Sequence, residues 1–458
     1  MSILDRPESI DLDESLGRYE KFNLKENPFP SEPAVNMKSD DIRINGGIFE
    51  MEIRRDEFNR VLKNFIKVPQ NDRTHYRLGY IVDTSYIGRG NGKSAFLINL
   101  ANLINEQFCL DLSEKVNKCF GVCFSPQPGG RTKLFSAFVD QLFDSFITFN
   151  IFNISLMLLR LEAIQHIQPD LLQKLNINEY EKISMSMITE DWYTSNNIEF
   201  QEVDKKMKEN HPELLSLDIF RGNYLFSKIV TQDDFIDFYV TLKKKEEKYQ
   251  FIFTDLVRFF RIVGFNGGYI FVDDYERIPD FQSARQKKDF ALELRSILYD
   301  GLFESAKTGF FVFFLVLHAG VSRLISESWS ASGMDHRSPL EELSHKHIIP
   351  FNKLDSSHAA LLLKKYISEY RIEKTEDDLF PFTNEVVSTI SEKSENNAAK
   401  ILKSAYELLE KAVGETDVII IDPDFEKKYS SIYDRNVDDS EDFDSTKSID
   451  LLEKAKGE

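Results

Sequence analysis

A glycine-rich segment between a predicted strand and a predicted helix carries the residues best suited to bind phosphate. The apolar run LGYIV (78–82) is followed by a loop that ends in GRGNG, and Lys93 and Ser94 begin an amphipathic helix. Glycines let backbone N–H groups point toward an anion, and a helix N-terminus adds the positive end of its dipole. Lys93 would reach the outer phosphates of a nucleotide, and the Ser94 hydroxyl would ligate Mg²⁺. The predicted nucleotide contacts are Gly88, Arg89, Gly90, Asn91, Gly92, Lys93, Ser94 and Ala95.

The loop departs at one position from the usual phosphate-binding pattern. G-x-x-x-x-G-K-[ST] requires Gly at position 87, where the chain has Ile87, and Gly88 stands one place later. The alternative is a glycine-rich turn that binds no phosphate. The strand before the loop and the helix after it favour the nucleotide site, because phosphate binding requires these parts in this order.

A second group of chemically capable residues lies in GGYIFVDDYERIPD (267–280). Four apolar residues followed by Asp273 and Asp274 predict a buried strand. Its end would place the two carboxylates at the edge of a sheet, where ligands bind in such folds. Asp273 would hold Mg²⁺ and Asp274 would polarise the attacking water. The alternative is a core strand that ends in a solvated acidic turn.

A third candidate is His318, which follows the apolar run 309–317. At the tip of the strand beside the acidic strand, this side chain would sense the terminal phosphate of a bound nucleotide. A single histidine in such a place is also compatible with a purely structural role, and both interpretations stay open.

The elements that must position these residues alternate between strand and helix. Strands are predicted at 78–82, 118–125, 267–272 and 309–317, and helices at 93–107, 134–149 and 281–303. This order predicts an α/β fold, a parallel sheet with helices on both faces. Apolar periodicity without strands predicts three more helices at 355–371, 383–393 and 396–413.

The chain is expected to divide into four parts. Residues 1–70 form an N-terminal arm, in which Phe22, Leu24 and Phe29 dock on a domain surface and 51–66 form a short helix. Residues 71–350 form the core, interrupted by a helical insertion at about 150–250. Residues 351–413 form a helical lid. Residues 414–458 form an acidic tail, in which VIIIDPDF makes a strand or a docking segment.

Composition limits the classes of protein to which the chain can belong. The formal net charge is −19, and residues 414–458 contribute 14 acidic and 6 basic side chains, a net of −8. The charge argues against nonspecific coating of nucleic acid, although a local basic patch stays possible. Three cysteines, a polar N-terminus and no apolar run of membrane-spanning length predict a cytoplasmic protein with no membrane attachment.

Three segments match a known pattern: FNLKENPFP (22–30), IGRGNGKSAFLINL (87–100) and LVLHAGVSRLI (315–325). They resemble, in this order, the F-x-L-x-x-N-P-F opening, the phosphate loop and the sensor strand of AAA+ P-loop ATPases. Within this class they resemble the branch of secretion ATPases, transposition-regulator ATPases and origin-recognition proteins. GGYIFVDDYERI and the long interruption before it also resemble ATP-binding proteins of phage-exclusion (BREX) operons.

The resemblance implies ATP and Mg²⁺ as cofactors, a P-loop NTPase fold with a C-terminal helical lid, and assembly into a homo-oligomer. The chain departs from the family in having Asp-Asp where Asp-Glu is usual, so either water activation by Asp274 is weaker or Glu276 assists it. In the lid helix, Lys400 is the only cation near the position of the usual arginine. Arg337 is the best of the weak candidates for an arginine finger.

Two functions fit these features. The first is an ATP-hydrolysing switch that assembles with itself and with a protein partner through the insertion or the acidic tail, in DNA-related work such as anti-phage defence or transposition control. The second is a weakly hydrolysing, ATP-loaded scaffold that recruits an effector. DNA binding would use the cations on or near helix 281–303, which are Arg277, Arg285, Lys287, Lys288 and Arg295. A solvated helix face is the alternative.

Overall fold

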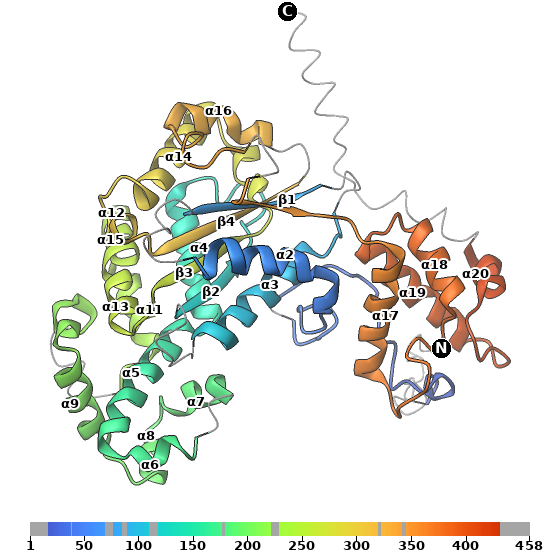
Figure 1. Ribbon diagram of the computed structural model, residues 1–458, viewed down its shortest axis with the longest axis horizontal. Coiled ribbons are helices and arrows are strands. Elements are labelled where there is room, and N and C mark those ends of the chain that lie inside the picture. The colour runs from blue at the N-terminus through green and yellow to red at the C-terminus, as the bar shows by residue number, and fades with distance from the viewer. Residues whose placement is uncertain are drawn as a thin grey trace, which may run out of the picture. The chain divides into compact units, whose positions relative to one another are not determined.

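The computed structural model describes residues 17–37, 39–68, 77–84, 89–109, 118–175, 179–220, 229–318, 322–340 and 345–430. These residues form two compact units (Figure 1), which are described separately. The sheet unit contains residues 35–37 and the described part of 45–353. The helical unit contains residues 17–34, 39–44 and 354–430.

A five-stranded parallel sheet forms the centre of the sheet unit, in the spatial order β2-β3-β4-β1-β5. The strands are β1 (Leu78–Asp83), β2 (Cys119–Phe124), β3 (Gly267–Val272), β4 (Phe311–Leu317) and β5 (Ile348–Phe351). Four of them lie where the apolar runs predict strands. The α/β class and the parallel sheet flanked by helices are therefore confirmed.

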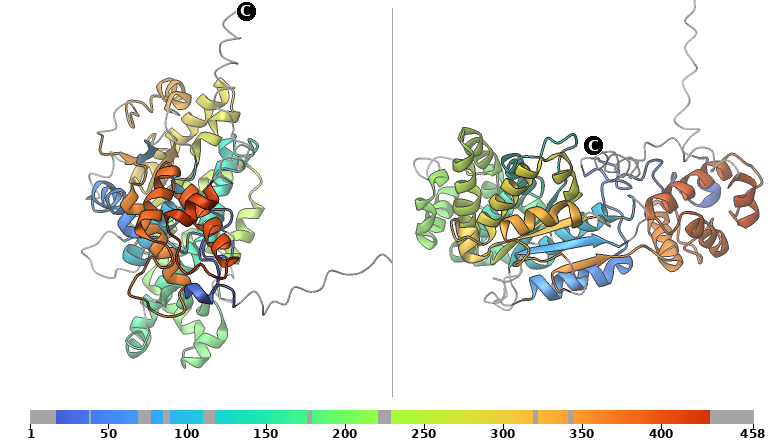
Figure 2. Two further views of the ribbon diagram at one scale, coloured as in Figure 1. Left: turned by 90° about the vertical axis from the view of Figure 1, so that its right-hand side faces the viewer. Right: turned by 90° about the horizontal axis from the view of Figure 1, so that it is seen from above.

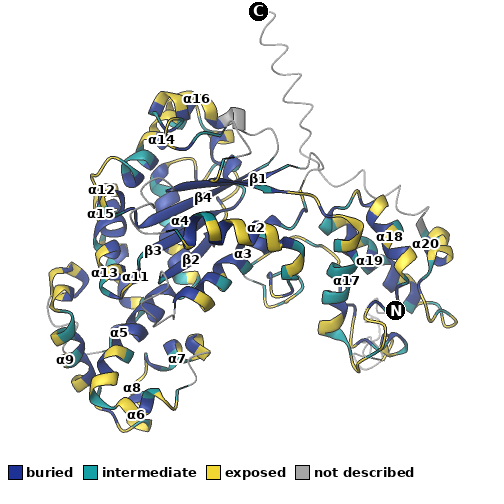
Figure 3. Ribbon diagram, viewed as in Figure 1, coloured by how far each residue is buried: buried dark blue, intermediate teal, exposed yellow. Residues whose placement is uncertain are grey.

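Side chains of the sheet alternate between two apolar layers, which is why central strands such as β3 and β4 are buried along their whole length (Figure 3). In β4, Phe311, Phe313 and Leu315 point into one layer, whereas Val312 and Phe314 point into the other. The first layer is covered by helices that include α4 (Phe135–Thr148), α5 (Ile151–Ile167) and α14 (Ala284–Leu298). The second is covered by α2 (Arg55–Val61) and α3 (Lys93–Ile104). Figure 2 shows helices on both sides of the sheet in the view from above.

Two helices differ from the sequence prediction. The predicted helix 281–303 ends at Leu298, and a separate helix, α15 (Glu304–Thr308), precedes β4. Gly301 lies between them with a φ of 71°, a backbone conformation that a continuing helix cannot contain. The N-terminal helix begins with a 3₁₀ turn at Met51–Arg54 and ends in a π-helical turn at Leu62–Ile66.

The segment between α4 and β3 is helical and contains no strand in its described residues. Its helices are α5, α6 (Pro169–Leu172), α7 (Tyr180–Ser186), α8 (Glu190–Ser195), α9 (Phe200–Asn210), α11 (Gln232–Thr241), α12 (Lys245–Gln250) and α13 (Leu256–Ile262). A π-helical turn, Phe251–Asp255, joins α12 to α13. The apolar side chains of α5 are buried around its whole circumference, so this helix belongs to the core of the unit.

In its described residues, the helical unit combines four α-helices with the N-terminal segment. Its helices are α17 (Ser356–Tyr370), α18 (Asn384–Lys393), α19 (Ala398–Val413) and α20 (Pro423–Ser430). Phe22, Leu24 and Phe29 are fully buried in this unit, and Leu24 forms an antiparallel bridge with Arg371. Ile421 forms a parallel bridge with Phe382, so part of the VIIIDPDF segment docks by its backbone.

Strand β5 was not predicted from the sequence. It has four residues, includes Pro350, and pairs only with β1 at the edge of the sheet. Proline lacks an N–H and is tolerated at such an edge.

Within the described residues, no single helix is long and apolar enough to cross a membrane. The pair α4 and α5, which is bent by 51°, would pass the same test of length and composition.

Candidate functional site

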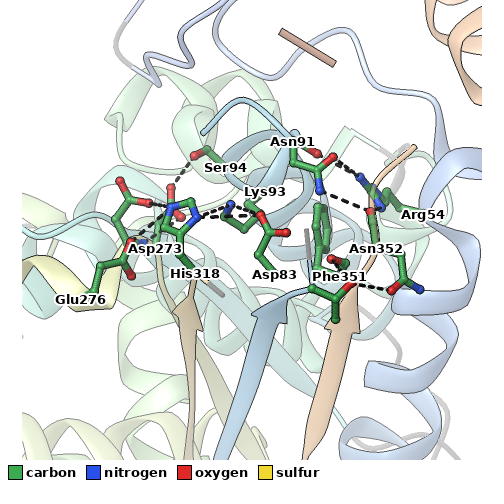
Figure 4. Close-up of polar contacts among 12 residues, drawn as sticks. Arg54, Asp83, Asn91, Lys93, Ser94, Asp273, Glu276, His318, Phe351 and Asn352 are labelled. Atoms are coloured by element: carbon green, nitrogen blue, oxygen red, sulfur yellow. Dashed lines mark hydrogen bonds and ion pairs between the residues drawn. The ribbon is translucent and has the colours of Figure 1, made fainter. Parts of the chain in front are cut away.

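The parallel strands bring three of the predicted chemical groups to one edge of the sheet. The register pairs Val82 of β1 with Leu317 of β4, and Leu315 of β4 with Val272 of β3. Since the residues that follow these strands lie at the same edge, Lys93, Asp273 and His318 come together although the sequence separates them widely. Figure 4 shows their side chains pointing toward one another above the strand ends.

The described part of the glycine-rich loop leads directly into α3. Gly90 and Gly92 have φ values of 101° and 82°, which favour glycine, and Gly92 is the residue from which the helix begins. The Gly92 carbonyl accepts the first helical hydrogen bond, from Phe96 N at 3.0 Å. Ala95 lies in the first turn. Gly88 lies outside the described residues.

A buried arginine, Arg54, supports the glycine-rich loop through hydrogen bonds to backbone carbonyls. Arg54 Nη2 donates to the Asn91 carbonyl at 2.9 Å, and Nη1 donates to the Asn352 carbonyl at 2.7 Å (Figure 4). Its guanidinium also lies 3.8 Å from the centre of the Phe351 ring and contacts Glu57. Burial lowers the pKa of Arg54. Sequence analysis missed this residue because its partners are backbone atoms of distant segments.

Lys93 is held by two side chains at the strand ends. Its ammonium donates to Asp83 Oδ2 at 2.6 Å and to His318 Nδ1 at 3.2 Å. Asp83 is completely buried. Sequence analysis missed Asp83, although an acidic residue at the end of an apolar strand was the signal by which it found Asp273.

Ser94 and Asp273 form a direct contact between the helix start and the acidic strand. Ser94 Oγ donates to Asp273 Oδ2 at 2.5 Å, across 179 residues of sequence. Ser125 Oγ lies 3.4 Å from the same oxygen. Burial and the neighbouring Asp274 raise the pKa of Asp273. A hydroxyl and a carboxylate so placed are oxygen ligands of the kind that hard divalent cations prefer.

Asp274, the residue after Asp273, has an unusual backbone conformation. Its φ is 44°, which a non-glycine residue rarely adopts. Its Oδ2 pairs with Arg277 at 2.5 Å, and its Oδ1 lies 3.5 Å from His318 Nε2. Burial opposes ionisation of Asp274, but His318, Arg277 and Arg89 outweigh it and lower its pKa to about 2. A carboxylate of this pKa is a weak base.

Glu276 is the most isolated charged group of the site. Its side chain is 7% exposed, and its Oε1 lies 3.2 Å from His318 Nε2 without the alignment of a hydrogen bond. Neither oxygen has a hydrogen-bond partner of normal geometry among the residues that the structure describes. Burial raises the pKa of Glu276 to about 7.

The structure therefore brings together Lys93, Ser94, Asp273, Asp274, Glu276 and His318. Lys400 belongs to the helical unit, where its ammonium lies 3.2 Å from Glu395. Of the cations proposed for DNA, Arg277, Arg285 and Arg295 each contact a carboxylate of their own segment. The guanidinium of Arg337 lies over the ring of Tyr299.

No family model and no curated protein sequence significantly matches this chain. The fold and the geometry at the strand ends are therefore the basis for the function proposed next.

Proposed function

We propose that this chain is an ATP-binding protein of the P-loop NTPase class, and that it hydrolyses ATP with Mg²⁺. One observation carries the proposal: the hydrogen bond of 2.5 Å between Ser94, in the first turn of α3, and Asp273, at the end of β3. It joins two residues that the sequence predicts as ligands of Mg²⁺ from separate segments, the glycine-rich loop and the acidic strand.

The fit to a magnesium–triphosphate ligand is supported by the charges. Ser94 Oγ and Asp273 would hold Mg²⁺, which supplies positive charge to the phosphate oxygens when bound. Burial and the neighbouring Asp274 raise the pKa of Asp273, and a bound divalent cation would offset both effects. Lys93 would exchange its contacts with Asp83 and His318 for contacts with phosphate oxygens, and N–H groups at the start of α3 would bind the same anion.

The two acidic residues after Asp273 suit different roles. Asp274 is held by Arg277 and has a pKa of about 2, so it is poorly suited to accept a proton from water. Glu276, with a pKa of about 7, is better matched to a general base at neutral pH. We therefore assign base catalysis to Glu276 and a positioning role toward His318 to Asp274.

At the level of the molecule, we propose an AAA+-type switch that assembles with itself and engages a protein partner, in DNA-related work such as defence or transposition control. A weakly hydrolysing scaffold is the second candidate. The ion pair between Arg277 and Asp274 favours this scaffold, because it engages the first acidic residue after Asp273. Turnover on the order of 1 s⁻¹ would favour the switch, and turnover far below it the scaffold.

Titration with a fluorescent ATP analogue, combined with phosphate release, tests the proposal. We expect Mg²⁺-dependent binding, and we expect Glu276→Gln to bind nucleotide but release phosphate at least about tenfold more slowly. Absence of Mg²⁺-dependent binding by the wild-type protein would overturn the proposal. Unchanged phosphate release by Glu276→Gln would overturn the assignment of the base.

A further inference from the structure

Three donor groups beside the Ser94–Asp273 pair form a cluster of their own. One ligand atom from each of Asp274, Glu276 and His318 lies within 4.8 Å of the other two. His318 Nε2 is the centre of the cluster, 3.2 Å from Glu276 Oε1 and 3.5 Å from Asp274 Oδ1. Asp274 keeps its other oxygen for Arg277, so the oxygen that faces His318 remains available as a ligand.

The cluster lacks the hydrogen bonds that buried polar groups normally make. Glu276 is 6% exposed, and among the described residues neither of its oxygens accepts a hydrogen bond. Within the same part of the chain, the buried His318 Nε2 has no hydrogen-bond partner of normal geometry either. A buried carboxylate without donors is strongly unfavourable unless it takes up a proton or a cation neutralises it. The unpartnered oxygens and nitrogen therefore point to a positive ligand between them.

We propose that Asp274, Glu276 and His318 bind a transition-metal ion, separate from the magnesium site at Ser94 and Asp273. Two carboxylates and one imidazole suit Mn²⁺, Fe²⁺ or Zn²⁺, since imidazole nitrogen is a poor ligand for Mg²⁺. The Ser94 hydroxyl and Asp273 carboxylate offer oxygens alone. The two sites therefore differ in donor chemistry as well as in residues.

The state of His318 links this metal site to Lys93. The Lys93 ammonium can only donate, so at 3.2 Å it requires an unprotonated Nδ1, and a neutral His318 then carries its proton on Nε2. A metal on Nε2 requires the opposite tautomer. Asp83 Oδ2, 3.9 Å from Nδ1, is the carboxylate that would accept the Nδ1–H of the metal-bound form. Lys93 must therefore leave Nδ1 before the metal binds tightly.

This link has a consequence that rests on the proposed function. Movement of Lys93 to a phosphate group would favour the metal-binding tautomer of His318, so nucleotide and metal would bind with positive coupling. Glu276 bound to a metal is no longer a free base, so occupancy of the cluster would slow phosphate release.

Co²⁺ titration of the untagged, chelator-treated chain tests the site without nucleotide. Excess Mg²⁺ keeps the Ser94–Asp273 pair from competing, and binding is measured by visible absorption and by calorimetry. We expect one Co²⁺ per chain, with affinity reduced at least about tenfold in Glu276→Gln and in His318→Ala. Ser94→Ala should bind Co²⁺ as the wild type does, and Lys93→Ala should bind it several-fold more tightly.

Two results would overturn the proposal: Co²⁺ affinity equal in the wild type, Glu276→Gln and His318→Ala, or no Co²⁺ binding by the wild type. Weaker binding by Lys93→Ala would overturn the tautomer link. Thermal unfolding without metal controls for misfolding, and added Co²⁺ should raise the unfolding temperature of the wild type more than that of Glu276→Gln. Nucleotide titration of the same variants separates a failure of this site from a failure of the proposed ATPase.

Discussion

Two regions of the sheet unit bury charged side chains, and they differ in how these side chains are paired. In the helical segment, Arg160 of α5 is 1% exposed and donates through Nη1 and Nη2 to the carbonyls of Met187 and Val230, and only its Nε lacks a partner among the described residues. At the strand ends, Glu276 is nearly as buried but has no hydrogen-bond donor among the described residues. Backbone carbonyls are permanent partners of Arg160, whereas no donor of normal geometry among the described residues pairs with Glu276. We infer that the first charge holds the fold together and that the second serves a ligand.

The largest expected effect concerns Arg160, the buried charge to which we assign a structural role. Arg160→Leu removes the guanidinium donors of two buried carbonyls, of which that of Met187 keeps the Tyr193 hydroxyl as a donor, and we expect a loss of about 3 kcal/mol in the local stability of the helical segment. Hydrogen exchange of the α5 amides measures this loss. Arg285→Leu is the matched control, because the side chain of Arg285 is 90% exposed. Equal protection of α5 in the two variants would remove the structural role of Arg160.

The second prediction concerns the site at the strand ends, to which we assign a function in ligand binding. Ser94→Ala removes a hydroxyl from the proposed magnesium site, and we expect about tenfold weaker binding of Mg-ATP, or about 1.4 kcal/mol. Ser125→Ala is the matched control, since Ser125 Oγ lies 3.4 Å from the same Asp273 oxygen. Its affinity should change by less than about twofold. Nucleotide titration of both variants at fixed Mg²⁺ checks this, and identical affinities would contradict the assignment of Ser94.

A third, smaller effect uses two glycines with similar backbones in different places. Gly92 (φ 82°) and Gly129 (φ 70°) both have open space where a Cβ would lie. Alanine should destabilise the chain by about 1 kcal/mol at either position, because of the left-handed backbone. Only Gly92→Ala should also weaken nucleotide binding, since Gly92 begins α3. Thermal unfolding and nucleotide titration separate the two effects, and equal nucleotide affinity in the two variants would count against the loop.

The smallest expected effect is a dependence of stability on pH that comes from His347, a buried histidine with a backbone partner. His347 is 8% exposed, its Nε2 contacts the Pro339 carbonyl at 2.6 Å, and burial lowers its pKa below 6.5. The unfolded chain therefore takes up a proton on this histidine more readily than the folded chain does. Its contribution to stability is present above pH 6.5 and is lost as the pH falls through the folded-state pKa.

Comparison of the wild type with His347→Gln isolates this contribution. Between pH 8 and pH 5.5, we expect the unfolding temperature of the wild type to fall by about 1 °C more than that of the variant. A larger fall in the variant would mean that the pKa of His347 is raised.

Much of the sheet could be predicted because its strands are long, continuously apolar and bounded by glycines or charged residues. β3 and β4 are examples, and the carboxyl ends of parallel strands then place Asp273 and His318 at one edge. β5 was missed because four residues with a proline carry little periodicity. The break after Leu298 was missed because the apolar spacing continues through Gly301 to Phe303.

Within the site, the sequence identified residues that belong to a local pattern and missed those defined only by tertiary contacts. Lys93 and Ser94 follow a recognisable loop. Arg54 supports that loop through carbonyl groups of Asn91 and Asn352, and no local pattern predicts such partners. The unpaired state of Glu276 is likewise a property of its surroundings, which spacing alone does not reveal.

The central claim is that Lys93, Ser94 and Asp273 form one binding site for Mg-ATP. Equilibrium titration of the wild type and Lys93→Ala with a fluorescent ATP analogue in Mg²⁺ tests it most directly, with thermal unfolding to verify that the variant is folded. We predict that Lys93→Ala binds at least about 100-fold more weakly, because it removes the ammonium that would contact the phosphates. Equal nucleotide affinity in the two folded proteins would contradict the claim.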